Sequence, residues 1–142
     1  MNKYIAPILM ASILIVGFSC KKENTSNSLT IQGVWEERVA SGSFTTTFPP
    51  GNGHTITFTT DHYEISSGGQ VTKSGSFQVL RDPSAATETC LDIQQGQYVN
   101  RIIYDGNTSA KKIFLEISND KLTFLSGCFA YDGGTSEEYA RQ

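Results

Sequence analysis

Apolar and polar residues alternate along the chain after Leu29 with a period of two residues. The alternation is clearest in residues 55–59 (TITFT), 63–65 (YEI) and 75–79 (GSFQV). A period of two with one apolar face is typical of a β-strand that has one side in a core and the other in water. No segment after Leu29 has a clear helical period, so the pattern predicts an all-β domain.

Nine strands are predicted from this alternation and from local enrichment in Thr, Val, Ile, Tyr and Phe. They are residues 34–40, 54–60, 62–66, 70–80, 87–94, 98–104, 111–117, 121–130 and 136–140. Most connections are short and rich in Gly, Asn and Asp, which suit tight turns and antiparallel hairpins. A meander of such hairpins closes most economically into a barrel, because closure removes the exposed sheet edges. The predicted fold is a small antiparallel up-and-down β-barrel of eight or nine strands.

Residues 1–19 have the pattern of a secretory signal peptide. One positive charge, Lys3, precedes an apolar run from Ile5 to Ser19 that contains no charged residue. A charged start, a short apolar stretch and a small residue at its end are typical of an export leader. A transmembrane anchor is the alternative, but a spanning helix needs about 20 apolar residues, and this shorter run also contains Pro7.

Ser19-Cys20, at the end of the apolar run, resembles the lipobox of bacterial lipoproteins. The resemblance implies cleavage before Cys20, lipid modification of its thiol and acylation of the new amine. Several acyl chains hold a protein on a membrane where one chain is marginal. Lys21 follows the cysteine in place of the Asp that retains such proteins in the inner membrane, so an outer-membrane location, on the periplasmic or the surface face, is expected. Residues 20–28 then form a lipidated, polar tether.

The charge balance argues against nucleic-acid binding. The chain has 14 acidic and 11 basic residues, and removal of residues 1–19 takes away only Lys3, which leaves a net charge of 10 − 14 = −4. No basic patch emerges from this composition. The remaining chain is long enough for one domain with a core, predicted over residues 29–142.

Two cysteines remain if Cys20 carries lipid. Cys90 and Cys128 are a candidate disulfide, because exported proteins fold in an oxidising compartment. Strand parity turns Cys90 outward and Cys128 inward, although a bulge at Gly127 would reverse the second. Two cysteines and two histidines do not make a typical structural zinc site, so neither a metal nor another cofactor is expected.

The residues do not indicate an enzyme. Glu36 and Glu37 are adjacent, so on a strand they point to opposite faces and cannot act as a pair of carboxylates. No Cys–His arrangement marks a nucleophile, and no glycine-rich loop opens a helix that would bind phosphate.

Several short segments, in order, resemble bacterial lipocalin-like lipoproteins. Residues 32–36 (QGVWE) contain the Gly-x-Trp that opens the first strand of that family. The later segments that resemble its strands are residues 58–65, 75–77, 113–117, 119–124 and 138–141. The resemblance implies a lipocalin-like barrel over roughly residues 29–142, with Trp35 at a closed end and Arg141 covering it. The alternative is that Trp35 is ordinary core and Arg141 a frayed terminal charge.

The resemblance also implies a binding function, for a small apolar or amphiphilic ligand. A mouth would be rimmed by one of the two longer connections, Ser41–Gly53 and Arg81–Ala86, and the first is favoured because Phe44 and Phe48 supply apolar surface. Alternatively, Phe44 and Phe48 plug that end of the barrel. A different possibility is a structural module that docks an envelope protein, with a barrel filled by its own rings: Phe58, Tyr63, Phe77, Phe114 and Phe124.

Overall fold

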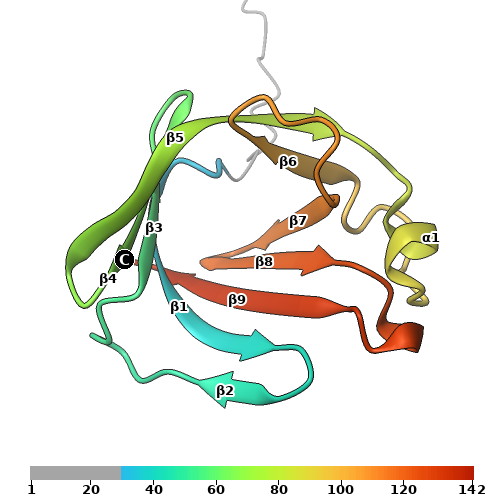
Figure 1. Cartoon of the computed structure of the whole chain (residues 1–142), viewed down its shortest axis with the longest axis horizontal. Coiled ribbons are helices and arrows are strands. Elements are labelled where there is room, and N and C mark those ends of the chain that lie inside the picture. Colours follow the sequence, from blue (N-terminus) through green and yellow to red (C-terminus); the bar gives the residue numbers. More distant parts are fainter. Residues whose placement is uncertain (1–29) are drawn as a thin grey trace, which may run out of the picture.

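β1 (Gly33–Ser41) closes the barrel because it pairs with strands on both of its edges. In the computed structural model, which describes residues 30–142, one edge of β1 pairs with β3 (Thr55–Phe58) and the other with β9 (Thr135–Arg141). Between them follow β4 (His62–Ser67), β5 (Gln70–Arg81), β6 (Asn100–Tyr104), β7 (Ile113–Ser118) and β8 (Lys121–Ser126). All neighbours are antiparallel (Figure 1). The result is an eight-stranded up-and-down barrel, compatible with a lipocalin-like fold.

The all-β prediction is confirmed, with two local differences. A short strand, β2 (Thr45–Thr47), lies inside the predicted connection Ser41–Gly53 and pairs with the last residues of β1. The predicted strand 87–94 is wrong: α1 (Ala85–Thr89) occupies this place. Asp82 Oδ1 accepts hydrogen bonds from the Ser84 amide and hydroxyl at 3.1 and 2.6 Å, which turns the chain before the helix.

The predicted leader (1–19), lipidated Cys20 and tether (20–28) lie outside the described residues. Within residues 30–142, no helix is long and apolar enough to cross a membrane.

A second short helical element, the 3-10 turn η1 (Phe129–Tyr131), follows β8. The expectation that no helix follows Leu29 is therefore wrong at two short connections, which hold too few residues for a helical period to be recognised.

One end of the barrel is filled and covered; we call it the closed end. Trp35 is completely buried there, and its Nε1 donates to the Ile31 carbonyl at 2.7 Å. The Arg141 guanidinium lies 4.1 Å from the centre of the Trp35 ring and donates to the carbonyls of Gln32 and Thr30, both at 2.8 Å. The expectation that Arg141 covers Trp35 is confirmed.

The connection from β5 to β6, residues 82–99, covers the outer face of β6, β7 and β8; we call it the strap. Phe114 and Leu125 are register partners that point away from the barrel interior, yet both are buried. Ala85 and Thr89 of α1 are buried as well. The expectation that Phe114 lines the interior is therefore wrong, because β7 is apolar on both faces: Leu115 points inward and Phe114 packs beneath the strap.

Polar contacts hold the strap to the strands beneath it. Asp82 pairs with Arg101 of β6 at 3.4 Å and with Lys112, just before β7, at 3.3 Å. Lys112 also pairs with Glu88 of α1 at 2.9 Å. Further along, the Tyr98 amide donates to Glu116 of β7 at 2.8 Å. The strap is thus tied to two neighbouring strands as well as packed on them.

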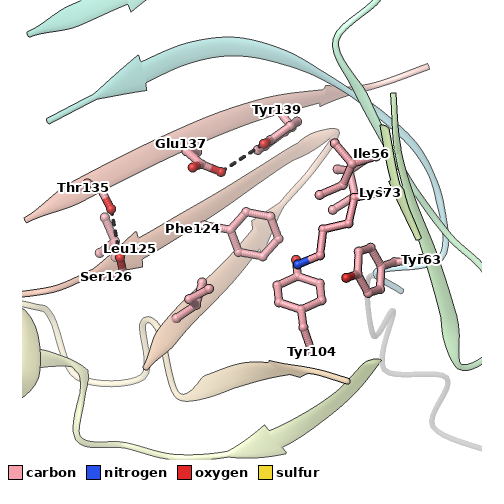
Figure 2. Close-up of a pocket in the computed structure, with 12 residues that line it drawn as sticks. Ile56, Tyr63, Lys73, Tyr104, Phe124, Leu125, Ser126, Thr135, Glu137 and Tyr139 are labelled. Carbon is pink, nitrogen blue, oxygen red and sulfur yellow. Dashed lines mark hydrogen bonds between the residues drawn. The ribbon is translucent and has the colours of Figure 1, made fainter. Parts of the chain in front are cut away.

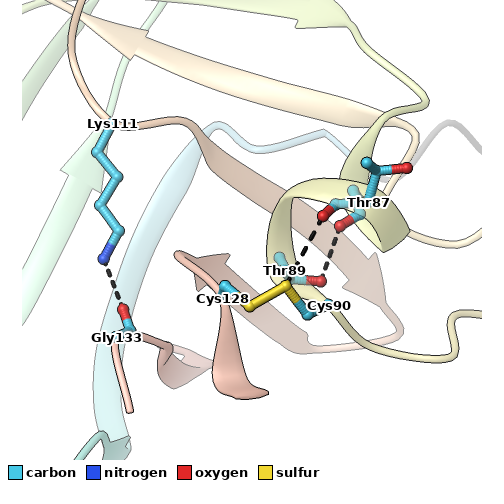
Figure 3. Close-up of a disulfide and its surroundings, with 7 residues drawn as sticks. Thr87, Thr89, Cys90, Lys111, Cys128 and Gly133 are labelled. Atoms are coloured by element: carbon cyan, nitrogen blue, oxygen red, sulfur yellow. Dashed lines mark hydrogen bonds between the residues drawn. A yellow bond between two sulfur atoms is a disulfide. The ribbon is translucent and has the colours of Figure 1, made fainter. Parts of the chain in front are cut away.

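The predicted disulfide is confirmed. Cys90, at the C-terminal end of α1, is bonded to Cys128, two residues after β8, with a Cα–Cα distance of 5.0 Å (Figure 3). Gly127 has a φ of +70°, which turns the chain so that Cys128 reaches the strap on the outer face. A side chain at Gly127 would collide with the carbonyl of Gly133. Glycine is therefore required on both conformational and steric grounds.

Removal of the disulfide should destabilise the barrel. We expect Cys90→Ala/Cys128→Ala to lower the free energy of unfolding by about 3–4 kcal/mol, because the bridge closes a 38-residue span in the unfolded chain. Urea denaturation of the domain, with Cys20 removed, measures this loss. Two free thiols per denatured, non-reduced wild-type domain, or an unchanged midpoint in the double variant, would contradict the assignment.

Candidate functional site

A cavity of about 250 Å³ lies in the other end of the barrel, which we call the open end (Figure 2). It is bounded by the first residues of β7 and β9 and by the last residues of β6 and β8. The residues around it are Ile56, Tyr63, Ile65, Lys73, Tyr104, Ile113, Phe124, Leu125, Ser126, Thr135, Glu137 and Tyr139. Lys73, Thr135 and Glu137 are exposed, so the cavity communicates with solvent.

Aromatic and branched aliphatic side chains make up the inner part of the cavity. Phe124 of β8 packs edge-on against Tyr139 of β9, with ring centres 5.8 Å apart. Ile56 of β3 and Ile113 of β7 complete this apolar wall. Such a surface favours the apolar part of a ligand, since burying it removes both surfaces from water.

Two tyrosines on the opposite wall are held in fixed positions. Tyr63 packs edge-on against Tyr104 at 4.6 Å, and its hydroxyl donates to Asp105 at 3.1 Å. Asp105 also accepts from the Ser76 amide at 3.0 Å. Gly75 makes this arrangement possible, because any Cβ at that position would collide with the Asp105 carboxylate. Burial raises the pKa of Tyr104 well above its usual range, so its hydroxyl stays protonated at neutral pH.

Lys73 is the cation of the cavity. Its Nζ lies 5.6 Å from the centre of the Tyr63 ring and 5.9 Å from that of Tyr104. An ammonium at this distance from aromatic faces is stabilised by their negative quadrupole. Among the described residues, Lys73 forms no ion pair. Its charge is therefore open to a group that enters the cavity.

Acidic groups gather on β1 and β9. Glu137 accepts a hydrogen bond from the Tyr139 hydroxyl at 3.0 Å (Figure 2). Glu37 is the register partner of Tyr139 and so shares its inward face. Burial, followed by repulsion from Glu137, raises the pKa of Glu37 above its usual value. Two carboxylates thus lie close together along one wall of the open end.

The connection between β1 and β3 is fixed by a buried carboxylate. Glu36, on the outer face, accepts hydrogen bonds from the amides of Gly51 and Gly53 at 3.1 and 3.4 Å and from the side chain of Gln142 at 3.0 Å. It also pairs with Arg38. These interactions, led by the Gly51 amide, lower the pKa of Glu36.

The structure does not bring Phe44 and Phe48 to the lining of this cavity. Phe44 follows the end of β1 and is 87% exposed, while Phe48 packs against His54 with ring centres 5.3 Å apart. The connection that carries them does lie at the open end, since β1 ends there. A part for these rings in ligand binding stays a prediction. Cys20 lies outside the described residues, and Cys90 and Cys128 form the bridge on the outer face.

The sequence reasoning did not single out Lys73, Glu137 and Tyr139. Strand parity was the available signal: Lys73 has the parity of Phe77, and Glu137 that of Tyr139 and Arg141. Residues of one parity share a face. Charged residues that point inward at one end of a barrel therefore indicate a polar and less completely filled part of its interior.

No group of three or more His, Cys, Asp or Glu side chains within residues 30–142 is placed to hold a metal ion. No protein-family model matches the chain, and no curated protein or solved structure is significantly similar to it.

The buried Glu36 predicts a specific pH dependence of stability. Because its pKa is lowered in the folded state, ionised Glu36 stabilises the protein above its unfolded pKa of about 4.3, and this contribution is lost as the pH falls through the folded pKa. We expect Glu36→Gln to lower the melting temperature at pH 7 and to flatten its decline on acidification below about pH 5.

Thermal melts from pH 7 to pH 3 test this expectation, with the exposed Glu64→Gln as the matched control. A Glu36→Gln profile parallel to that of the wild type would show that another carboxylate dominates.

Proposed function

We propose that this protein is a membrane-anchored lipoprotein whose barrel binds a small amphiphilic molecule in the cavity of its open end. The observation that carries the proposal is the unequal filling of the barrel. Trp35, Phe58 and Phe77 pack the closed end, whereas the open end holds a cavity with an apolar wall and a few polar groups. Apolar pockets with a few convergent polar groups are the usual form of small-molecule sites.

The size of the cavity restricts the ligand. Sites for drug-sized molecules measure roughly 300–1,000 Å³, and this cavity, at about 250 Å³, is slightly smaller. A short chain or a small aromatic molecule with one or two polar groups fits that volume. We assign the site to binding and not to catalysis. The Tyr139 hydroxyl does meet the Glu137 carboxylate, but burial raises the pKa of Tyr139, which disfavours the phenolate that would act as a nucleophile.

The expected anchor suits this arrangement. Residues 30–32 lie at the closed end, where Arg141 holds them. A tether over residues 20–28, lipidated at Cys20, would therefore enter the domain at the end opposite the mouth. The outer membrane is the membrane we propose, with the mouth free to exchange ligand with the aqueous side.

An envelope interaction module is the second candidate. Phe44 and Tyr131 are 87% and 84% exposed. They lie on connections that approach each other, because a Cβ added at Gly42, near Phe44, would lie 3.6 Å from the side chain of Thr135, which follows the connection of Tyr131. Exposed aromatic side chains on neighbouring loops are typical of protein contacts. This candidate gains if the cavity proves unable to take a ligand.

Blocking the cavity should abolish binding. We expect the wild type to bind the apolar dye N-phenyl-1-naphthylamine saturably at one site, and Ser126→Trp to lose this binding because the indole fills the cavity. Ser74→Trp is the matched control, since Ser74 neighbours Lys73 but points to the outer face and is exposed. Dye fluorescence titrations measure both, with Phe44→Ser/Phe48→Ser testing the contribution of that connection. Absence of saturable binding in folded wild type would favour the interaction module.

The anchor has its own test. We expect cells fed a clickable fatty acid to label the wild type, and Cys20→Ala to lose both the label and the association with membranes. Fractionation with an alkaline wash measures the association. A Cys20→Ala protein that still sediments with the membranes would refute the lipoprotein assignment.

A further inference from the structure

The charges of the cavity are separated onto opposite walls of the barrel. Lys73 lies on β5, and Glu137 lies on β9. In the closed strand order, β5 and β9 are four strands apart in either direction, so they face each other across the interior. Glu37, on β1 beside β9, adds a second carboxylate to the acidic wall. The cavity therefore has a positive side and a negative side.

These opposite charges do not neutralise each other. Neither Lys73 nor Glu137 forms an ion pair within the part of the chain that the structure describes. The Lys73 ammonium is instead placed over the rings of Tyr63 and Tyr104, while Glu137 is held by the Tyr139 hydroxyl. Each charge thus has a neutral partner that fixes its position and leaves it free to bind an opposite charge.

Apolar side chains share this cavity with the two charges: Ile56, Ile113 and Phe124 line it together with Lys73 and Glu137. In Figure 2 the Phe124 ring lies between the Glu137 and Lys73 side chains. A ligand that spans the cavity therefore meets a cation, an apolar surface and a carboxylate in turn. These three contacts define the ligand more narrowly than amphiphilic character does.

We propose that the ligand is a small zwitterion, with an anionic group on Lys73, a cationic group on Glu137 and an apolar segment between them. This inference rests on the proposed binding function and names its ligand class. Lys73 and Glu137 are both exposed to solvent, and a ligand that covers their charges without compensation would leave them desolvated. An anion alone leaves the acidic wall unpaired, and a cation alone leaves Lys73 unpaired.

A matched set of three six-carbon compounds tests the charge requirement. The probes are 6-aminohexanoate, hexanoate and hexylamine, measured by calorimetric or NMR titration on the mature chain without lipid. We expect 6-aminohexanoate to bind at least about tenfold more tightly than either single-charge analogue, since one additional charge-assisted hydrogen bond accounts for that factor. Equal or tighter binding of hexanoate or hexylamine would overturn the proposal.

Variants then assign the two ends of the ligand. We expect Lys73→Met to remove the advantage of 6-aminohexanoate over hexylamine, and Glu137→Gln to remove its advantage over hexanoate. Lys121→Met and Glu138→Gln are the matched controls, because these residues pair with each other at 3.3 Å on the outer face. Preference for the zwitterion that survives both cavity variants would contradict the assignment.

The dye titration separates this inference from the proposed function. Wild type that binds N-phenyl-1-naphthylamine but does not prefer 6-aminohexanoate keeps the binding function and refutes the zwitterion. Wild type that binds neither compound refutes both. Melting temperatures of all four variants, measured alongside, show whether a lost preference reflects a lost fold.

Discussion

The stack of Arg141 on Trp35 joins the first and the last strand of the barrel. Trp35 is in the first strand and Arg141 is the last residue of β9, so their contact requires the last strand to return to the first. The same guanidinium binds two carbonyls of residues 30–32. An aromatic face, a cation and two hydrogen bonds to the backbone thus converge on one place, and together they close the sheet and cover its end.

The asymmetry of the interior follows from this closure. Trp35 and its neighbours Phe58 and Leu122 fill the closed end. The open end has an apolar wall that includes Ile56 and Phe124, but its tyrosines, lysine and carboxylates do not pack as tightly, because they would lose their hydration. The strap adds stability on the outer face of β6 to β8 without occupying the interior. The packed closed end and the cavity at the open end therefore both follow from how the side chains are distributed along the closed barrel.

Much of the fold could be predicted from the sequence, because period-two alternation reports directly on a strand with one buried face. Alternation did not predict burial where a second element covers the outer face of a strand. Phe114 and Leu115 are adjacent and both buried, since the strap covers one face and the barrel the other. The helix at residues 85–89 has only five residues, too few for a helical period to appear.

The candidate site was harder to predict than the fold. Lys73 and Glu137 resemble residues of solvated strand faces, and parity assigns them inward only once the core face of each strand is known. Their position opposite each other depends on the strand order of the closed barrel, which a local pattern does not contain. The disulfide was easier, because exclusion of Cys20 left one possible pair, although the reversal at Gly127 had to be inferred from its glycine.

The central claim is that one end of this barrel is packed and the other receives a ligand. Methyl and indole NMR of the domain, recorded as N-phenyl-1-naphthylamine is added, tests it most directly. We expect large shifts for the methyl groups of Ile65 and Ile113, with the single indole signal, from Trp35, unchanged. Shifts confined to exposed side chains such as Val71 and Val79, or a displaced Trp35 signal, would contradict it.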